Sequence, residues 1–244
     1  MGTREDGLEE GLRELNLVRM AEVAKDYLRR CQDGKWSYKR LLAELVAEEK
    51  AHRRARTLAT RIHRANLPEK WTLETFPFER QPGVDRAQMN QLAELDFVRQ
   101  GINLSFIGGT GVGKTGLASS LLLKALQNGF RGVRLQMQDM LDDLHRSIAD
   151  RKTKYLLTRL SRLDLLLVDE LGYLCVNQDQ AALFFKLMHT RYELKKSTII
   201  TTNLGYDGWV QYLHNPPMVA ALLSRLRERC VTIEIQGPDL RKSA

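Results

Sequence analysis

The chain has 244 residues, of which 43% are hydrophobic and 28% charged, and this suits one sizeable globular domain with a smaller one attached. It has 38 Lys and Arg against 30 Asp and Glu, and the net charge of +8 favours a polyanionic partner such as nucleic acid. Cys31, Cys175 and Cys230 form no CxxC pair, and the apolar runs are shorter than a membrane span. These features exclude a zinc or disulfide framework and a membrane helix, so we expect a soluble intracellular protein.

Residues 1–65 are predicted to form a small helical domain. Apolar residues recur at helical spacing from Leu8 to Tyr27, which predicts one helix. Ser37 can cap a second helix that continues to Arg64. From Lys50 to Arg64 there are six Lys or Arg and no acid, so this part offers either a solvated face or a phosphate-binding surface.

Residues 66–84 contain three prolines and a glycine and are predicted to form an extended linker. Strands then alternate with helices through residues 85–244, beginning with a helix that Asp85 can cap and that runs to Val98. The strands are expected at 102–107, 133–135, 165–168, 198–202 and 231–235. This order predicts an α/β fold, a five-stranded parallel sheet between two helical layers, with no separate lid domain after Gly237.

A glycine-rich loop follows the first of these strands and opens a helix. Its sequence fits the phosphate-binding pattern G-x-x-x-x-G-K-[ST] in the strand–loop–helix context that the pattern requires. Backbone N–H groups of such a loop, together with the helix N-terminus, bind phosphate, and the Lys and Thr reach the outer phosphates and Mg²⁺. An ordinary glycine turn would rarely supply all these parts, so we expect a nucleoside triphosphate to be bound by Gly108, Gly109, Thr110, Gly111, Val112, Gly113, Lys114, Thr115 and Gly116.

Two carboxylates, Asp169 and Glu170, follow the uniformly apolar strand 165–168. Beside a phosphate loop, Asp169 is positioned to hold Mg²⁺ and Glu170 to polarise the attacking water. On its own the pair would more simply begin a surface loop. Asn203 ends the next strand, where it orients water near the γ-phosphate or merely starts a turn. A later helix carries Arg225, Arg227 and Arg229, and such a run is either a solvated face or the source of an arginine that stabilises transition-state charge in a neighbouring subunit.

Together, Gly108–Thr115, Asp169-Glu170, Thr201-Thr202-Asn203 and Ser224-Arg225 follow the motif order of AAA+ ATPases. Over nearly its whole length, the sequence also resembles the IstB-type ATP-binding helper proteins of insertion sequences, cousins of the DnaC-type helicase loaders. The more family-specific segments of this resemblance are Ala65–Pro68, Thr72–Phe76 and Asp169–Leu174.

The resemblance implies an ATPase of the bacterial cytoplasm that uses ATP and Mg²⁺. It further implies a homo-oligomer, a ring or helical assembly, that binds duplex DNA with little sequence preference and recruits or activates its transposase. By motif match, catalysis falls to Lys114, Glu170, Asn203 and Arg225, with Arg225 acting in trans. Thr115 and Asp169 become the Mg²⁺ ligands.

Two basic clusters are candidates for DNA contact, and Phe76 and Phe78 either flank the adenine or pack against the ATPase core. The DNA candidates are Arg53, Arg54, Arg56 and Arg61 in the first cluster, and Arg146, Arg151, Lys152 and Lys154 in the second.

Three other functions stay open. A replicative helicase loader would share all the catalytic residues. A small-molecule P-loop kinase suits the Asp169-Glu170 pair and Asn203 less well, because these side chains favour water activation. A nucleotide-gated scaffold that does not hydrolyse would need Lys114 but not Glu170. The lack of an Asn-Lys-x-Asp signature favours ATP over GTP.

Overall fold

The computed structural model describes residues 7–68, 72–173 and 176–241, so Leu174 and Cys175 lie outside the described part. The chain divides into two compact units, Met1–Thr60 and Arg61–Ala244. This division falls inside the long helix α3 (Tyr38–Arg64) and not at residue 65. Residues 66–84, which the sequence analysis treated as a linker, therefore belong to the second unit.

The first unit is built from α1 (Gly7–Glu14), α2 (Val18–Asp33) and the first part of α3. The single helix predicted across Leu8–Tyr27 is wrong, because Asn16 adopts a left-handed conformation (φ 58°) between α1 and α2. Asn tolerates this conformation better than most residues. Ser37 accepts a hydrogen bond from the Arg40 N–H at 3.3 Å, as expected for the cap of α3.

Glu49 of α3 is 5% exposed and replaces the missing side-chain cap of α2. One carboxylate oxygen accepts the backbone N–H groups of Arg19 (2.8 Å) and Met20 (3.1 Å), and the other accepts Arg53 Nε at 2.8 Å. The carboxylate thus satisfies orphan donors at the N-terminus of α2 and ties α3 to α2.

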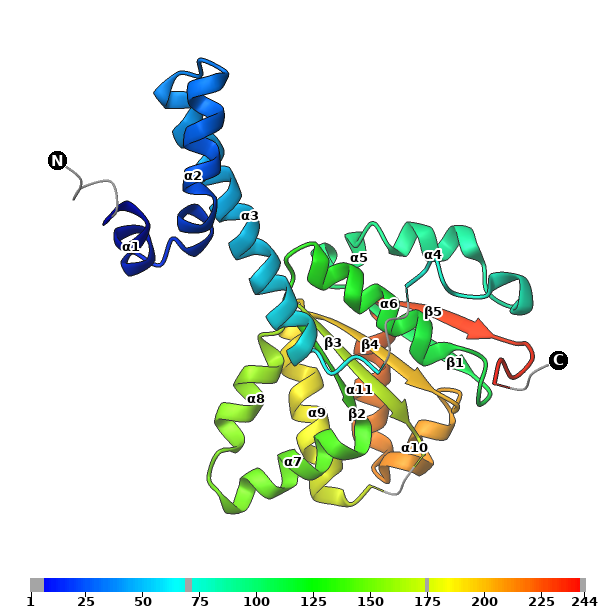
Figure 1. The fold of residues 1–244 in the computed structure, drawn as a ribbon. Helices are drawn as coiled ribbons and strands as arrows, with labels where there is room; N and C mark the ends of the chain where they lie inside the picture. The colour runs from blue at the N-terminus through cyan, green and yellow to red at the C-terminus, as the bar shows by residue number, and fades with distance from the viewer. Residues whose placement is uncertain (1–6, 69–71, 174–175, 242–244) are drawn as a thin grey trace. The chain divides into compact units, whose positions relative to one another are not determined.

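The second unit contains the predicted five-stranded parallel sheet, in the order β2-β3-β4-β1-β5 (Figure 1). Every adjacent pair of strands is parallel. The strands are β1 (Asn103–Gly108), β2 (Gly132–Gln136), β3 (Leu165–Leu171), β4 (Ser197–Thr202) and β5 (Cys230–Ile235). Since β4 lies between β3 and β1, the carboxyl ends of these three strands meet at one edge, where parallel α/β sheets bind ligands.

Helices cover both faces of the sheet, which confirms the three-layer prediction (Figure 1). The helix after β1, α6 (Lys114–Gln127), packs on one face and is almost wholly buried. Leu166, Val168 and Ile200 of the sheet join one apolar cluster with helices on the other face. Those helices are α7 (Met137–Ala149), α8 (Thr153–Ser161), α9 (Gln178–Glu193), α10 (Gly208–Leu213) and α11 (Pro216–Glu228).

The segment that leads into β1 contains η1 (Phe78–Arg80), α4 (Arg86–Leu92) and α5 (Asp96–Gln100). Asp85 caps α4 as predicted, accepting the Ala87 N–H at 2.7 Å. The single helix expected from Asp85 to Val98 is wrong, because Leu95 turns left-handed (φ 65°) while its side chain is fully buried. Among the described residues, no helix is long and apolar enough to cross a membrane.

Candidate functional site

The glycine loop joins β1 to α6 and curls around the side chain of Lys114. Gly111 (φ 80°) and Gly113 (φ 97°) take left-handed conformations that favour glycine. A Cβ at Gly113 would stand 2.7 Å from the Phe76 ring, so glycine is also required for this close approach. Lys114 is 7% exposed and its Nζ donates to the carbonyls of Gly108 (2.9 Å) and Gly109 (2.6 Å). The loop therefore has the conformation that the sequence pattern predicts.

The Asp169 carboxylate, fully buried at the end of β3, has hydrogen-bond donors on both of its oxygens. Oδ1 accepts the Thr115 hydroxyl at 2.9 Å and also the Thr201 hydroxyl. Oδ2 forms an ion pair with Arg134 of β2, at 2.9 Å from Nε and 2.7 Å from the second guanidinium nitrogen. The structure thus brings Thr115 and Asp169 together, as the sequence analysis expected of the two proposed Mg²⁺ ligands.

Glu170 follows Asp169, but its side chain does not share the contacts of the Asp169 carboxylate, because the Glu170 backbone is left-handed (φ 62°). Its N–H donates to the Thr201 hydroxyl oxygen at 3.0 Å, and its exposed carboxylate accepts Gln136 Nε2 at 3.2 Å. Thr201 therefore bridges the two acidic residues, accepting from one backbone and donating to the other side chain. A left-handed non-glycine residue held by such contacts is typical of functional sites.

A pocket of about 660 Å³ opens over the loop. Its lining includes Gly111, Gly113, Lys114, Thr115 and Gly116 from the loop and helix, Glu170 and Thr201 from the strand ends, and Pro68, Tyr173, Leu240 and Arg241. Burial lowers the pKa of Lys114, and the Arg241 charge lowers it further, whereas Asp169 and Glu170 act to raise it. The pocket thus places the cations Lys114 and Arg241 and the Glu170 carboxylate beside a glycine-rich loop that opens a helix, an arrangement that suits a polyphosphate.

The donor set at this pocket fits ATP and Mg²⁺. A hydroxyl and a carboxylate, from Thr115 and Asp169, are hard oxygen ligands of the kind that Mg²⁺ takes beside substrate phosphates and water. Among the described residues, no group of three or more His, Cys, Asp and Glu is placed to hold a metal by itself. An ion here would therefore share its coordination with the nucleotide.

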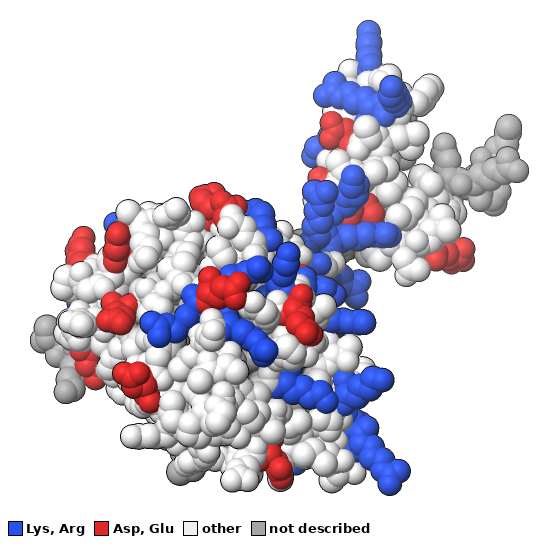
Figure 2. All heavy atoms as spheres, turned by 180° about the vertical axis from the view of Figure 1, so that it is seen from behind, with Lys and Arg blue, Asp and Glu red and all other residues white. Residues whose placement is uncertain are grey.

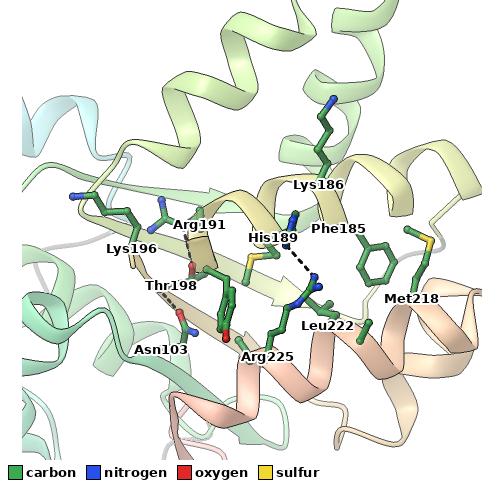
Figure 3. A pocket seen from close by; sticks show the side chains of 14 residues that line it. Asn103, Phe185, Lys186, His189, Arg191, Lys196, Thr198, Met218, Leu222 and Arg225 are labelled. Carbon is green, nitrogen blue, oxygen red and sulfur yellow. Dashed lines mark hydrogen bonds between the residues drawn. The ribbon is translucent and has the colours of Figure 1, made fainter. Parts of the chain in front are cut away.

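Two proposed catalytic residues lie apart from the lining of this pocket. Asn203 is exposed immediately after β4 and close to Gly172. Arg225 of α11 lines a different pocket, of about 340 Å³, between α9 and α11 (Figure 3). Neither residue belongs to the described lining of the P-loop pocket. For Arg225, this separation is compatible with action on a neighbouring subunit but not on its own loop.

In the second pocket, Arg225 is held by a histidine. One guanidinium nitrogen lies 3.0 Å from His189 Nδ1 (Figure 3). On the other side of the ring, His189 Nε2 lies 3.2 Å from Glu193 Oε1. Arg cannot accept a hydrogen bond, so His189 accepts at Nδ1 and carries its proton on Nε2. Arg191 nearby is 1% exposed and donates to the Leu160 carbonyl at 2.7 Å. Burial lowers the pKa of Arg191 to about 9, so it stays charged at neutral pH.

The basic candidates divide into engaged and free side chains. Arg53 pairs with Glu49, Arg61 donates to the Gly129 carbonyl at 3.0 Å, and Arg146 pairs with Asp143 at 2.9 Å. The remaining five are exposed and make no side-chain hydrogen bond or ion pair within the described chain: Arg54, Arg56, Arg151, Lys152 and Lys154. Lys and Arg side chains gather on each unit on the face drawn in Figure 2. The free residues are the better candidates for phosphate contact.

Three contributors to the site had no role assigned to them from the sequence. Arg134 was available as a signal, since a lone arginine inside the apolar strand Val133–Leu135 needs a buried anion. Gln81 is fully buried and donates to the carbonyls of Val112 (3.0 Å) and Pro238 (3.2 Å). No sequence motif predicts these contacts. The C-terminal segment Pro238–Arg241 lies against the loop, with the Leu240 N–H donating to the Gly111 carbonyl at 2.9 Å.

Comparison with known proteins settles the family. The family model described as "IstB-like ATP binding protein" matches residues 10–244. The chain belongs to this family. It is 33% identical over 234 residues to the ATP-binding protein assigned to insertion sequence IS21 of Pseudomonas aeruginosa, covering 96% of this chain and 88% of that protein. It is also 30% identical to the corresponding IS232 protein of Bacillus thuringiensis subsp. berliner, covering 93% and 90%.

Solved structures confirm the AAA+ P-loop fold. The crystal structure of the DnaC helicase loader superposes with a TM-score of 0.60 at 25% identity, covering 68% of this chain and 97% of that one. The replication initiator DnaA bound to AMPPCP and single-stranded DNA superposes with a TM-score of 0.59 at 21% identity, covering 71% and 52%. This IstB-like chain is therefore an ATP-binding AAA+ protein, and the second likeness carries the fold alone.

Proposed function

We propose that this IstB-like protein is an ATPase that self-assembles on duplex DNA and recruits or activates the transposase of its insertion sequence. Hydrolysis is supported by a hydrogen-bonded network at the P-loop. In this network Thr201 contacts both Asp169 and Glu170, and Asp169 accepts the Thr115 hydroxyl. A scaffold that only binds nucleotide would not need an exposed carboxylate held beside the phosphate cradle.

The chain's own residues divide the chemistry among them. Lys114, the loop N–H groups and Thr115 bind and orient the phosphates, and Asp169 with Thr115 would hold Mg²⁺, which supplies charge neutralisation when bound. Glu170 takes the proton of the attacking water, and its exposed carboxylate meets solvent at the pocket. Asn203 orients this water from the end of β4.

Arg225 completes the site of a neighbouring subunit in this proposal. It lies on the α9–α11 side of the domain, outside its own P-loop pocket, and His189 holds it in place. An arginine supplied in trans would make hydrolysis depend on assembly, and such arginines change rates by roughly 10³–10⁵-fold in related nucleotide hydrolases.

DNA binding is supported by the net charge of +8 and by the free cations Arg54, Arg56, Arg151, Lys152 and Lys154. Contacts of this type neutralise phosphates and read little sequence. The transposase is supported by the insertion-sequence names of the relatives. A helicase loader remains the second candidate, since the DnaC loader shares the fold at 25% identity.

The experiment measures ATP hydrolysis and sedimentation of the full chain with and without duplex DNA. ATP and DNA together should produce a large assembly, and the hydrolysis rate per subunit should rise with assembly. Full ATPase activity in a monomer would refute the proposal, as would a hydrolysis rate and a sedimentation that do not respond to DNA. Preferential binding to a replicative helicase over the neighbouring transposase would favour the loader.

A further inference from the structure

The last turns of α9 and α11 contact each other through two matching sets of polar side chains. Each set occupies positions i, i+3 and i+4, which lie on one face of a helix. The α9 set is His189, Tyr192 and Glu193, and the α11 set is Arg225, Glu228 and the adjoining Arg229. Buried apolar side chains of both helices, including Met188 and Leu222, line the pocket beside these sets, so packing fixes the two helices against each other.

Arg225 is exposed, and the side chains that contact it are an imidazole and an aromatic ring. One guanidinium nitrogen lies 3.0 Å from His189 Nδ1, which accepts the hydrogen bond (Figure 3). The guanidinium carbon lies 6.0 Å from the centre of the Tyr192 ring. Within the described part of the chain, no carboxylate forms an ion pair with Arg225.

The two acids nearest to Arg225 have other partners. Glu193 Oε1 lies 3.2 Å from His189 Nε2, and Glu228 Oε2 accepts the Tyr192 hydroxyl at 2.7 Å. The hydrogen bond to Glu228 raises the pKa of Tyr192, so the phenol keeps its proton and remains a donor. Each carboxylate therefore orients one of the two side chains that contact Arg225.

This arrangement orients the Arg225 guanidinium without neutralising it. A carboxylate would form a charge-assisted pair with the guanidinium and compete with phosphate for the same donors. A neutral imidazole instead accepts one of the five N–H donors, and the face of an aromatic ring attracts the cation. The positive charge and the remaining donors stay available for a phosphate oxygen.

We propose that Tyr192, together with His189, is a positioning residue that presents Arg225 to the nucleotide of a neighbouring subunit. This role rests on the proposed function, in which Arg225 acts in trans. Neither Tyr192 nor His189 belongs to the described lining of the P-loop pocket of its own chain, so both act on the reaction through Arg225. Holding a catalytic group in its reacting geometry raises the rate, and a displacement of about 1 Å can cost roughly 10²-fold.

The test measures the rate of ATP hydrolysis by the full chain on duplex DNA, and the ATP affinity of the chain without DNA. Tyr192→Leu removes the ring and the hydroxyl and should lower the rate at saturating ATP roughly tenfold, with the ATP affinity unchanged. Tyr192→Phe keeps the ring and should lose less. Arg227→Ala is the matched control, because this exposed arginine of α11 lies over Tyr206 instead, and it should change neither quantity.

Two further comparisons separate positioning from a merely structural role. His189→Asn keeps an acceptor oxygen near the place of Nδ1 and should retain most of the rate, whereas His189→Ala should fall about as far as Tyr192→Leu. Adding Tyr192→Leu to Arg225→Ala should lower the rate no further than Arg225→Ala alone, because the arginine that Tyr192 positions is already absent.

An unchanged hydrolysis rate in Tyr192→Leu would overturn the positioning role. So would a loss of ATP affinity in Tyr192→Leu, a further fall of the rate when this change is added to Arg225→Ala, or a His189→Asn protein as slow as His189→Ala. Full activity of Arg225→Ala alone is a different result, because it would overturn the proposed trans action of Arg225 itself.

Discussion

Replacing Arg134 with Met should destabilise the ATPase unit through the buried carboxylate that it leaves behind. Asp169 is fully buried and Arg134 is 9% exposed, and two guanidinium nitrogens lie 2.9 and 2.7 Å from Asp169 Oδ2. Removing one partner of a buried ion pair costs about 3–5 kcal/mol. Since Thr115 and Thr201 still donate to Oδ1, we expect about 3 kcal/mol, the lower end of this range.

For a unit of this size, 1 kcal/mol shifts Tm by about 2–4 °C, so Arg134→Met should lower Tm by roughly 6–12 °C. Urea unfolding followed by circular dichroism measures the free energy directly. Arg131→Met is the matched control, because Arg131, the residue before β2, pairs with Asp164 while its side chain is 61% exposed, and it should cost less than about 1 kcal/mol.

The double variant Arg134→Met/Asp169→Asn removes both charges and should recover part of the loss. A cost for Arg134→Met no larger than that of Arg131→Met would refute the reasoning, because the Asp169 carboxylate would then not depend on Arg134. Full additivity in the double variant would refute it equally.

Three further outcomes follow from other contacts. Burial opposes ionisation of Glu49, but Arg53 and the N–H groups of Met20 and Arg19 outweigh it and lower the pKa of the carboxyl. The stability that the ionised Glu49 contributes is therefore present above its usual pKa and lost as pH falls through the lowered pKa. Glu49→Gln should speed amide hydrogen exchange at Arg19 and Met20 at neutral pH. Unchanged exchange rates would count against the role of Glu49 as the cap of α2. Burial raises the pKa of Cys230 to about 11. Iodoacetamide at pH 8 should therefore modify Cys230 slowly in the folded chain and readily in urea, and equal modification rates would contradict the raised pKa. Changing Arg151, Lys152 and Lys154 together to Ala should weaken duplex binding and reduce the slope of log binding constant against log salt concentration by roughly one unit per residue. Arg146→Ala should change this slope less, because the Arg146 side chain already pairs with Asp143. A slope equal to that of the unchanged chain would exclude this surface as a DNA contact.

Local patterns were sufficient to predict the sheet and the phosphate loop. Five short apolar segments spaced by helices indicate a parallel sheet, and the Gly-Lys-Thr ending indicates the loop, because each strand, helix and turn follows a local sequence pattern. The order in which the strands pair is set by contacts far apart in the chain. The errors came at single left-handed residues. Asn16 and Leu95 interrupt segments whose apolar spacing continues on both sides, and periodicity does not register a change of φ at one position.

The parts of the site that the sequence did not predict depend on long-range pairing. Arg134 meets Asp169 only because β2 and β3 are adjacent, and Gln81 meets Pro238 across 157 positions. Thr201 was visible as a strand residue, but its bridge between Asp169 and Glu170 requires the β3–β4 register and the left-handed turn at Glu170. The assignments of Asn203 and Arg225 remain predictions, because the geometry of one chain leaves both outside its P-loop pocket.

The most direct test of the central claim, that one subunit completes the ATPase site of another on DNA, mixes two inactive variants. Lys114→Ala loses phosphate binding but keeps Arg225, and Arg225→Ala binds ATP but lacks the arginine. On duplex DNA, hydrolysis by the mixture should exceed the sum of the two separate rates, because mixed assemblies contain sites with Lys114 from one chain and Arg225 from its neighbour. A mixture no more active than that sum, or an Arg225→Ala protein with full activity on its own, would contradict the account.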